Sequence, residues 1–186
     1  MSKDVVVITG GAGGIGSVCG YKLDGYKLVI ADFNKEALNS AVQKMLSAGI
    51  DAVGFESDIT DQNSVNALLT FTKELGTFKG LIHTAGVSGT VKDAKRVFTI
   101  DLVATDMLIN AFYEIAEAKS VVVLFASMMG HVVPPNSEYD KALINPQSED
   151  AWTTIEPFIQ GNSDFMYNFA KRGVILLEKQ NAMRYG

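Results

Sequence analysis

The sequence predicts an α/β protein in which one parallel sheet is covered by helices on both faces. Short apolar runs rich in β-branched residues alternate with helical patterns along the chain, as they do in βαβ units. The runs are apolar almost throughout rather than alternating with polar residues, which is typical of strands buried on both faces. No repeat, low-complexity tract or linker divides the chain, so we expect one domain over residues 1–186.

The predicted elements follow the order of a doubly wound sheet. Strands are expected at 5–9, 28–31, 52–55, 80–84 and 121–126, and helices at 15–23, 35–48, 62–75 and 94–118. A stretch at about 131–164 departs from this alternation, because all four prolines of the chain lie there among acidic residues. We interpret it as an insertion with one or two short helices, one over 148–156 capped by Ser148.

Composition narrows the class of partner. The chain is 47% hydrophobic and 20% charged, with a formal net charge of −5, and no block of Lys and Arg exceeds two residues. These values favour a small-molecule partner over nucleic acid or a membrane surface. No apolar run is long enough to span a bilayer, and the first strand leaves no room for a signal peptide, so we predict a cytoplasmic protein. One cysteine and two histidines suggest neither a disulfide nor a metal site.

A glycine-rich turn, TGGAGGIG at 9–16, lies between the first predicted strand and the first predicted helix. It can be read as G-x-G-x-x-G on Gly11, Gly13 and Gly16, or as T-G-x-x-x-G-x-G on Gly10, Gly14 and Gly16. In either reading the glycines allow a tight turn and close backbone approach, and the helix N-terminus receives a pyrophosphate. The turn therefore predicts a dinucleotide-binding loop.

An acidic residue, Asp32, ends the second predicted strand. Its carboxylate can accept both ribose hydroxyls of NAD and repels the extra phosphate of NADP, so we predict NAD as the cofactor and NADP as the less favoured alternative. Phe33 and Asn34 follow and are not basic, although Lys35 is close in sequence. The alternative interpretation of Asp32 is a cap on the following helix.

These features, with the pair Asp58-Ile59 and the strand end His83-Thr84-Ala85-Gly86, resemble the short-chain dehydrogenase/reductase family over essentially the whole chain. The resemblance implies a Rossmann-like, three-layer α/β/α fold and an NAD-dependent oxidoreductase that acts on a secondary alcohol or ketone. It also implies the cofactor-binding residues, which are Thr9, Gly10, Gly14, Ile15, Gly16, Asp32, Phe33, Asp58, Ile59, Ala85 and Gly86, with Tyr167 and Lys171.

Three residues complete the resemblance: Ser127 after the fifth strand, and Tyr167 and Lys171 one helical turn apart. The resemblance implies that Tyr167 exchanges a proton with the substrate oxygen, that Lys171 supports Tyr167 and holds the nicotinamide ribose, and that Ser127 orients the reacting oxygen. A free tyrosine ionises near about pH 10, and a cation one turn away favours the ionised form. The alternative for Ser127 is a local hydrogen bond that ends the strand. Tyr139 also follows Ser127, but Leu143 stands four positions later, so we assign Tyr139 to the insertion.

The sequence departs from the family pattern at two places. Asp101 stands where the family has an Asn that takes part in a water-linked proton relay to the lysine, largely through its backbone carbonyl. Two interpretations remain open here: Asp101 preserves this relay, or its added carboxylate near Lys171 alters the charge balance of that residue. His83 and Thr84 replace the Asn pair of N-N-A-G, and we interpret His83 as a structural residue. The long 131–164 segment resembles longer-insert members such as bacterial 3α-hydroxysteroid dehydrogenase/carbonyl reductase.

Family members continue beyond the Tyr167 helix with further strands and substrate-lid helices, so we expect a fold truncated at its C-terminal side and a sequence that is part of a longer chain. If nothing follows it, 121–125 becomes an exposed sheet edge. An early end that is genuine favours an alternative function, a catalytically silent nucleotide-binding regulatory or scaffold protein, whereas the Ser-Tyr-Lys set favours the enzyme. The family commonly forms a homodimer or homotetramer, and Leu108, Phe112 and Ile115 on the helix at 94–118 are candidate contacts.

Overall fold

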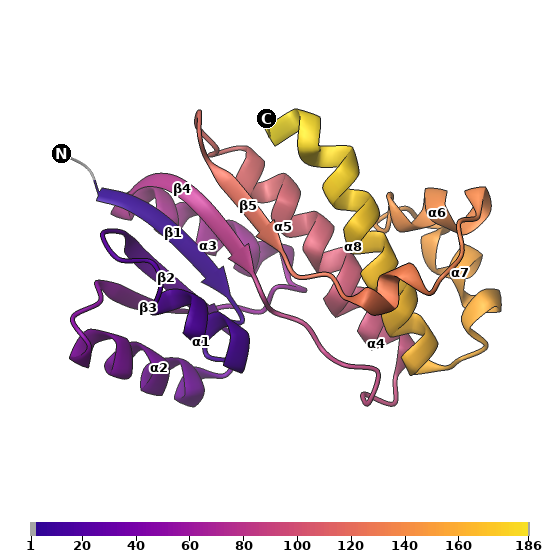
Figure 1. The fold of residues 1–186 in the computed structure, drawn as a ribbon, viewed down its shortest axis with the longest axis horizontal. Helices are drawn as coiled ribbons and strands as arrows, with labels where there is room; N and C mark the ends of the chain where they lie inside the picture. The colour runs from indigo at the N-terminus through magenta and orange to yellow at the C-terminus, as the bar shows by residue number, and fades with distance from the viewer. Residues whose placement is uncertain (1–2, 186) are drawn as a thin grey trace. The chain divides into compact units, whose positions relative to one another are not determined.

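A computed structural model describes residues 3–185 and confirms the predicted fold class, a parallel sheet flanked by helices (Figure 1). The chain divides into two compact units. Among the described residues, unit 1 comprises 3–85, 108–124 and Tyr185, and unit 2 comprises 86–107 and 125–184.

Unit 1 contains a five-stranded parallel sheet in the order β3-β2-β1-β4-β5. Its strands are β1 (Lys3–Thr9), β2 (Lys27–Asp32), β3 (Ala52–Glu56), β4 (Gly76–His83) and β5 (Val121–Leu124). The chain moves outward from β1 through β2 to β3 and then returns to the other side of β1 to form β4. The strand order therefore reverses between β1 and β4, where Thr9 pairs with His83. Ligands in such sheets bind at this switch point, outside the carboxyl ends of the strands.

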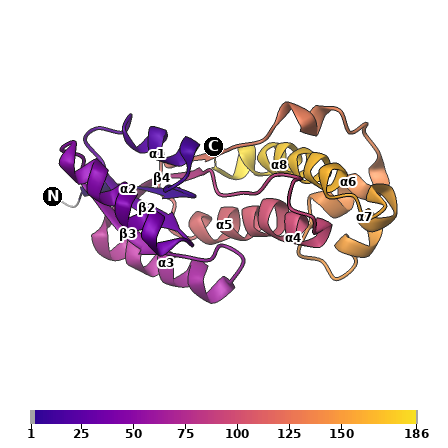
Figure 2. The same cartoon turned by 90° about the horizontal axis from the view of Figure 1, so that it is seen from below.

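Helices cover the sheet because alternate side chains of each strand point to opposite faces. Those of unit 1 include α1 (Gly14–Gly20), α2 (Lys35–Ser47) and α3 (Gln62–Leu75). On one face, Ile8 and Ile30 belong to a buried cluster with Leu38 and Met45 of α2, and Cys19 of α1 packs against it. Figure 2 shows α1 and α3 on opposite sides of the strands. Consecutive residues 5–9 of β1 and 28–31 of β2 are buried, which confirms burial on both faces for these central strands, whereas β3 and β5 are partly exposed.

The region predicted as one helix over 94–118 is not continuous. It forms α4 (Ala94–Phe98), the π-helix η1 (Thr99–Val103) and α5 (Ala104–Tyr113). The wider turn of a π-helix is often found at functional sites, and Asp101 lies at its centre. Of the three predicted oligomer contacts, Leu108 and Phe112 are completely buried and are therefore not available to a second copy of the chain. The third, Ile115, is half-buried.

The predicted insertion contains two short helices, α6 (Ser137–Leu143) and α7 (Ala151–Ile159), as expected. The 3₁₀-helix η2 (Met128–His131) precedes them, and α8 (Ser163–Tyr185) follows. Helices α6 and α7 lie against each other (Figure 1). A helix is present where one was predicted over 148–156, but α7 begins at Ala151 and ends at Ile159. The predicted Ser148 cap is wrong, because Asp150 precedes the helix and makes no side-chain cap. Pro157 lies inside α7 near its end, where the loss of one helix hydrogen bond interrupts little.

β5 forms one edge of the sheet, and its residues Val121 and Val123 are 57% and 41% exposed. An apolar edge at 121–125 is what the sequence predicts. In the described part of the chain, no helix combines the length and apolar character needed to cross a membrane.

Candidate active site

Close backbone packing holds the glycine-rich loop of unit 1 at the ends of β1 and β4. The Thr84 hydroxyl donates a hydrogen bond to the Thr9 carbonyl at 2.8 Å. Gly10 has a φ of +68°, and a Cβ at this position would lie 2.6 Å from the Ala85 nitrogen. A Cβ on Gly16 would lie 2.7 Å from Oγ1 of Thr84. Gly10 and Gly16 are therefore required by the packing of the loop itself.

Packing within the chain explains Gly11 of the loop but not Gly14. A Cβ on Gly11 would lie 2.6 Å from Cγ2 of Ile30, so packing against β2 explains this glycine. Gly14, the first residue of α1, is exposed and has no atom within 4 Å of its Cβ position. Its neighbour Ile15 is also 55% exposed. Packing within the described chain does not explain a glycine at 14, whereas close approach of a ligand would.

Asp32 at the end of β2 is bonded to the same loop. Its Oδ2 accepts a hydrogen bond from the Ala12 N–H, and its Oδ1 accepts one from the Asn34 N–H, both at 3.1 Å. Asn34 caps α2 by accepting a hydrogen bond from the Ala37 N–H, so the interpretation of Asp32 as the helix cap is wrong. Each carboxylate oxygen retains a lone pair for a ligand hydroxyl.

The remaining predicted cofactor residues of unit 1 lie near the ends of β2 and β3. Phe33 is 75% exposed, and Ile59 is buried. Asp58 is exposed and accepts hydrogen bonds from the Thr60 N–H at 2.9 Å and the Thr60 hydroxyl at 2.7 Å. These bonds fix the turn that follows β3.

Two further polar side chains of unit 1, Lys35 and His83, have partners within the chain. The Lys35 ammonium lies 3.1 Å from a carboxylate oxygen of Glu56, so its positive charge is balanced locally. His83 is buried, and its Nδ1 lies 2.7 Å from the Thr9 hydroxyl. This contact joins β4 to β1 and supports a structural role for His83.

Unit 2 carries Tyr167 and Lys171 on α8. The Lys171 Nζ lies 5.5 Å from the centroid of the Tyr167 ring, so the two side chains share one face of the helix, as their spacing predicts. Lys171 is only 9% exposed, and Nζ donates a hydrogen bond to the Phe125 carbonyl at 3.2 Å. The ammonium is therefore buried and fixed, whereas Tyr167 is half-buried.

Ser127 caps the short helix η2. Its Oγ accepts a hydrogen bond from the Met129 N–H at 3.2 Å, which is the local bond expected by the alternative interpretation. η2 itself packs on α8, because a Cβ on Gly130 would lie 2.7 Å from the Lys171 carbonyl carbon. Within residues 3–185, no hydrogen bond joins Ser127 to Tyr167 or Lys171. The Ser127 hydroxyl that accepts this bond still has its own proton to donate.

Asp101 contacts Lys171 from the π-helix. Its fully buried side chain places Oδ2 at 3.5 Å from the Lys171 Nζ, and Oδ1 accepts a hydrogen bond from the Val87 N–H at 2.7 Å. Burial raises the pKa of the Asp101 carboxyl above its ordinary value of 3.8, although the Lys171 charge and the Val87 N–H act to lower it. The Asp101 carboxylate is therefore in contact with the Lys171 ammonium.

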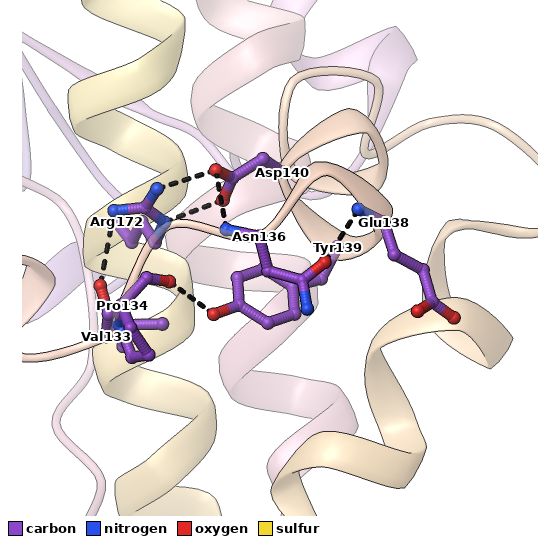
Figure 3. Close-up of polar contacts among 7 residues, drawn as sticks. All are labelled: Val133, Pro134, Asn136, Glu138, Tyr139, Asp140 and Arg172. Atoms are coloured by element: carbon purple, nitrogen blue, oxygen red, sulfur yellow. Dashed lines mark hydrogen bonds and ion pairs between the residues drawn. The ribbon is translucent and has the colours of Figure 1, made fainter.

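The next residue of α8, Arg172, fastens the insertion to this helix (Figure 3). Its Nε and Nη2 each donate to a different oxygen of Asp140 at 2.6 Å, and its Nη1 donates to the Val133 carbonyl at 3.2 Å. The hydrogen bond to Asp140 raises the pKa of the Arg172 guanidinium above its ordinary value. Both ends of segment 133–140 are thus bonded to the Arg172 side chain of α8.

The second tyrosine, Tyr139, belongs to the packing of the insertion. It is 3% exposed, and its hydroxyl donates to the Pro134 carbonyl (Figure 3). Its ring packs edge-on against Phe158 and Phe169, with centroid distances of 5.0 and 4.9 Å. This environment agrees with the assignment of Tyr139 to the insertion.

Sequence reasoning missed two contributions to the site. The Thr84 hydroxyl holds the glycine loop, and its place in the segment that replaces N-N-A-G was an available signal. The Arg172 bond to Asp140 had no such signal, because the two residues are 32 positions apart and no local spacing connects them.

A reversal of strand order beside a glycine-rich turn is the arrangement of dinucleotide-binding α/β proteins. A family model described as short chain dehydrogenase matches residues 4–139. The chain therefore belongs to the short chain dehydrogenase family.

Known proteins resemble the chain at moderate identity. A diacetyl reductase, (S)-acetoin forming, from Staphylococcus epidermidis is 27% identical over 145 residues, or 70% of this chain and 56% of the relative. The uncharacterized oxidoreductase YxjF from Bacillus subtilis is 27% identical over 187 residues, or 98% of this chain and 65% of the relative. The structure of NAD⁺-bound xylitol dehydrogenase is similar with a TM-score of 0.74 and 22% identity, over 98% of this chain and 65% of that one. The chain thus spans 56% of the diacetyl reductase that it matches.

Proposed function

We propose that this protein is an NAD-dependent oxidoreductase that interconverts a secondary alcohol and a ketone. The observation that carries the proposal is the pair on α8, a buried Lys171 ammonium 5.5 Å from the centroid of the Tyr167 ring. Membership of the short chain dehydrogenase family supports a redox role for this pair. A cation beside a phenol stabilises the ionised form, which is the form that can accept a proton from an alcohol.

The loop of unit 1 fits a dinucleotide. Gly14 leaves an exposed backbone position open, and the Asp32 carboxylate beside the loop retains acceptor capacity for ribose hydroxyls. We propose NAD rather than NADP, because Asp32 would repel the additional phosphate and the nearby Lys35 is already paired with Glu56. The residues proposed to hold the cofactor are Thr9, Gly10, Gly14, Ile15, Gly16, Asp32, Phe33, Asp58, Ile59, Ala85 and Gly86, with Tyr167 and Lys171.

When bound, the nicotinamide supplies or accepts the hydride. Tyr167 exchanges the proton with the substrate oxygen, as a base toward an alcohol and as an acid toward a ketone. Ser127 donates its hydroxyl proton in a hydrogen bond to the same oxygen and orients it, while the Met129 N–H holds the Ser127 oxygen. Lys171 supports the ionised phenol and has N–H donors beyond the bond to Phe125 for the cofactor ribose.

Turnover with two tyrosine variants tests the catalytic assignment. Diacetyl serves as a probe substrate because a relative is named for its reduction, together with a panel of secondary alcohols and NAD⁺. We expect Tyr167→Phe to lower kcat by about 10²- to 10⁴-fold, the usual contribution of a general acid or base, and to weaken NAD binding far less, because the other residues proposed to hold the cofactor remain. Tyr139→Phe is the matched control and should retain activity. Full activity of Tyr167→Phe, or a loss in Tyr139→Phe that equals it in a folded protein, would contradict the assignment.

Direct binding measurements test the choice of cofactor. We expect the wild-type chain to bind NAD⁺ more tightly than NADP⁺ in calorimetric titrations. Asp32→Ala should weaken NAD⁺ binding and narrow this difference, because the repulsion of the extra phosphate is removed. Asp58→Ala, which removes a carboxylate at the next strand end, is the control and should leave the NAD⁺ to NADP⁺ preference in place. Equal affinities in the wild type would refute NAD specificity.

A further inference from the structure

We propose that Asp101 is a positioning residue that anchors the Lys171 ammonium and offsets part of its positive charge at Tyr167. The proposal rests on the function proposed above and concerns the negative charge that Asp101 adds at a position where the family has an uncharged Asn. The ionisation of Asp101 would then tune how strongly Lys171 favours the ionised form of Tyr167.

The contacts of Lys171 leave its ammonium little freedom. An ammonium has three N–H donors. One donates to the Phe125 carbonyl at 3.2 Å, and the ion pair with Asp101 at 3.5 Å orients the group toward η1. Tyr167 lies on the same helix face, with its ring centroid 5.5 Å from Nζ. Asp101 and Phe125 therefore fix the charge that faces Tyr167.

Asp101 is itself held rigidly. Its Oδ1 accepts from the Val87 N–H at 2.7 Å, and its backbone carbonyl accepts from the Thr105 hydroxyl at 2.9 Å. A Cβ on Gly86 would lie 3.2 Å from Oδ1, so the segment that follows β4 closes over the carboxylate. The side chain and the backbone of Asp101 are therefore both fixed by neighbours in unit 2.

The oxygen that faces Lys171 is unusual. Among the described residues, Oδ2 of Asp101 is the buried side-chain oxygen or nitrogen without a hydrogen-bond partner. A buried carboxylate oxygen without a hydrogen bond is unfavourable unless an opposite charge compensates for it. Lys171 supplies that charge. A Cβ on Gly173 would lie 2.5 Å from Leu102 Cδ1. This close contact between η1 and α8 fixes the distance between Asp101 and Lys171, which are the neighbours of Leu102 and of Arg172 in the chain.

The charges that face one another here are few. Lys171 on α8 is the charged group that contacts Asp101, whereas the segments at 86–87 and 125 contribute a backbone N–H and a carbonyl. The adjacent Arg172 is bonded to Asp140 and the Val133 carbonyl. With Asp101 ionised, the pair is nearly neutral as a whole. Without this negative charge, the ammonium acts on Tyr167 uncompensated and favours its ionised form more strongly.

Ultraviolet titration of tyrosine ionisation tests this inference without requiring turnover. Asp101→Asn removes the charge and keeps an acceptor for the Val87 N–H. The Tyr167 contribution is obtained as the difference from Tyr167→Phe, measured in both the wild-type and the Asp101→Asn backgrounds. We expect this contribution to ionise at a pH lower by about half to one unit in Asp101→Asn, as loss of one nearby charge predicts. If Asp101→Asn does not fold, Asp101→Ser removes the same charge with a smaller side chain and is titrated in its place.

The matched control is Asp106→Asn, which removes a carboxylate from the following helix while keeping an acceptor for the Gln147 amide. It should leave the Tyr167 titration unchanged. If turnover is found, the acidic limb of the kcat/KM profile should move to lower pH in Asp101→Asn by a similar amount. Superimposed titrations of wild type and Asp101→Asn, a shift to higher pH, or an equal shift in Asp106→Asn would overturn the inference. Absence of turnover together with the expected shift of the Tyr167 titration in Asp101→Asn would refute the proposed function alone.

Discussion

Replacing Asp140 with Asn tests the ion pair that fastens the insertion to α8. The side chains of Arg172 and Asp140 are only 13% and 23% exposed, and both hydrogen bonds between them measure 2.6 Å. Exposed ion pairs contribute about 0–1 kcal/mol, and hydrogen bonds to buried charged groups about 1.5–3 kcal/mol each. For this largely shielded pair we expect Asp140→Asn to lower the free energy of unfolding by roughly 2 kcal/mol, or Tm by about 4–8 °C.

Urea unfolding followed by tryptophan fluorescence is the appropriate assay. The chain has one tryptophan, Trp152, which lies on α7 in the same unit as the ion pair. A double-mutant cycle with Arg172→Met isolates the interaction between the two side chains. We expect a coupling free energy of about 1.5–2.5 kcal/mol, because the charge-assisted fork is lost in either single variant.

The control is the Lys35–Glu56 pair, whose side chains are 71% and 53% exposed. Its cycle, followed by circular dichroism, should give a coupling below about 0.5 kcal/mol. A coupling between Asp140 and Arg172 as small as that of the control would refute the view that this fork fastens the insertion to α8.

Three further predictions concern stability. Gly16→Ala should lower the free energy of unfolding by about 1–3 kcal/mol, because its Cβ would lie 2.5 Å from the Gly10 carbonyl oxygen. Gly14→Ala should not lower it, because no atom lies within 4 Å of that Cβ position; equal thermal shifts of the two variants by circular dichroism would contradict this. Hydrogen bonds from Lys3 and Lys27 lower the pKa of Asp51 below 3.8. The stability that these bonds give the folded protein is therefore present above pH 3.8 and is lost as the pH falls through the lowered pKa, so acid unfolding of Asp51→Asn should show no such loss of stability. Burial raises the pKa of Asp101 above 3.8, so folding favours its protonated form, and the stability of the wild type relative to Asp101→Asn should fall as the pH rises above 3.8 in urea titrations at successive pH values.

Local sequence patterns predicted the strands and most of the helices of this protein. The apolar runs and the helical periodicity fixed five strands and the helices between them, and the helix at 62–75 was predicted with the bounds that α3 has. The glycine turn, Asp32 and the spacing of Tyr167 and Lys171 were also readable, because each depends on neighbours within about one turn or one strand end.

The predictions that failed depend on tertiary packing or on the backbone path, which local sequence patterns do not reveal. The π-helix at 99–103 interrupts a sequence with continuous helical character, and close packing of Leu102 with Gly173 of α8 accompanies it. The Ser148 cap was wrong because several residues near 148 have capping chemistry, and only the backbone path selects where α7 begins. Burial of Leu108 and Phe112 likewise depends on what packs over them, which periodicity does not reveal.

By itself, the sequence determined the class of fold, the nucleotide loop and which polar side chains stand one helical turn apart. Only the tertiary structure decided that Asp101 pairs with Lys171 and that Arg172 binds Asp140, because residues 70 and 32 positions apart in these pairs meet through packing rather than through any local pattern. The same packing set the burial of the Asp101 carboxyl, and with it the direction in which its pKa moves.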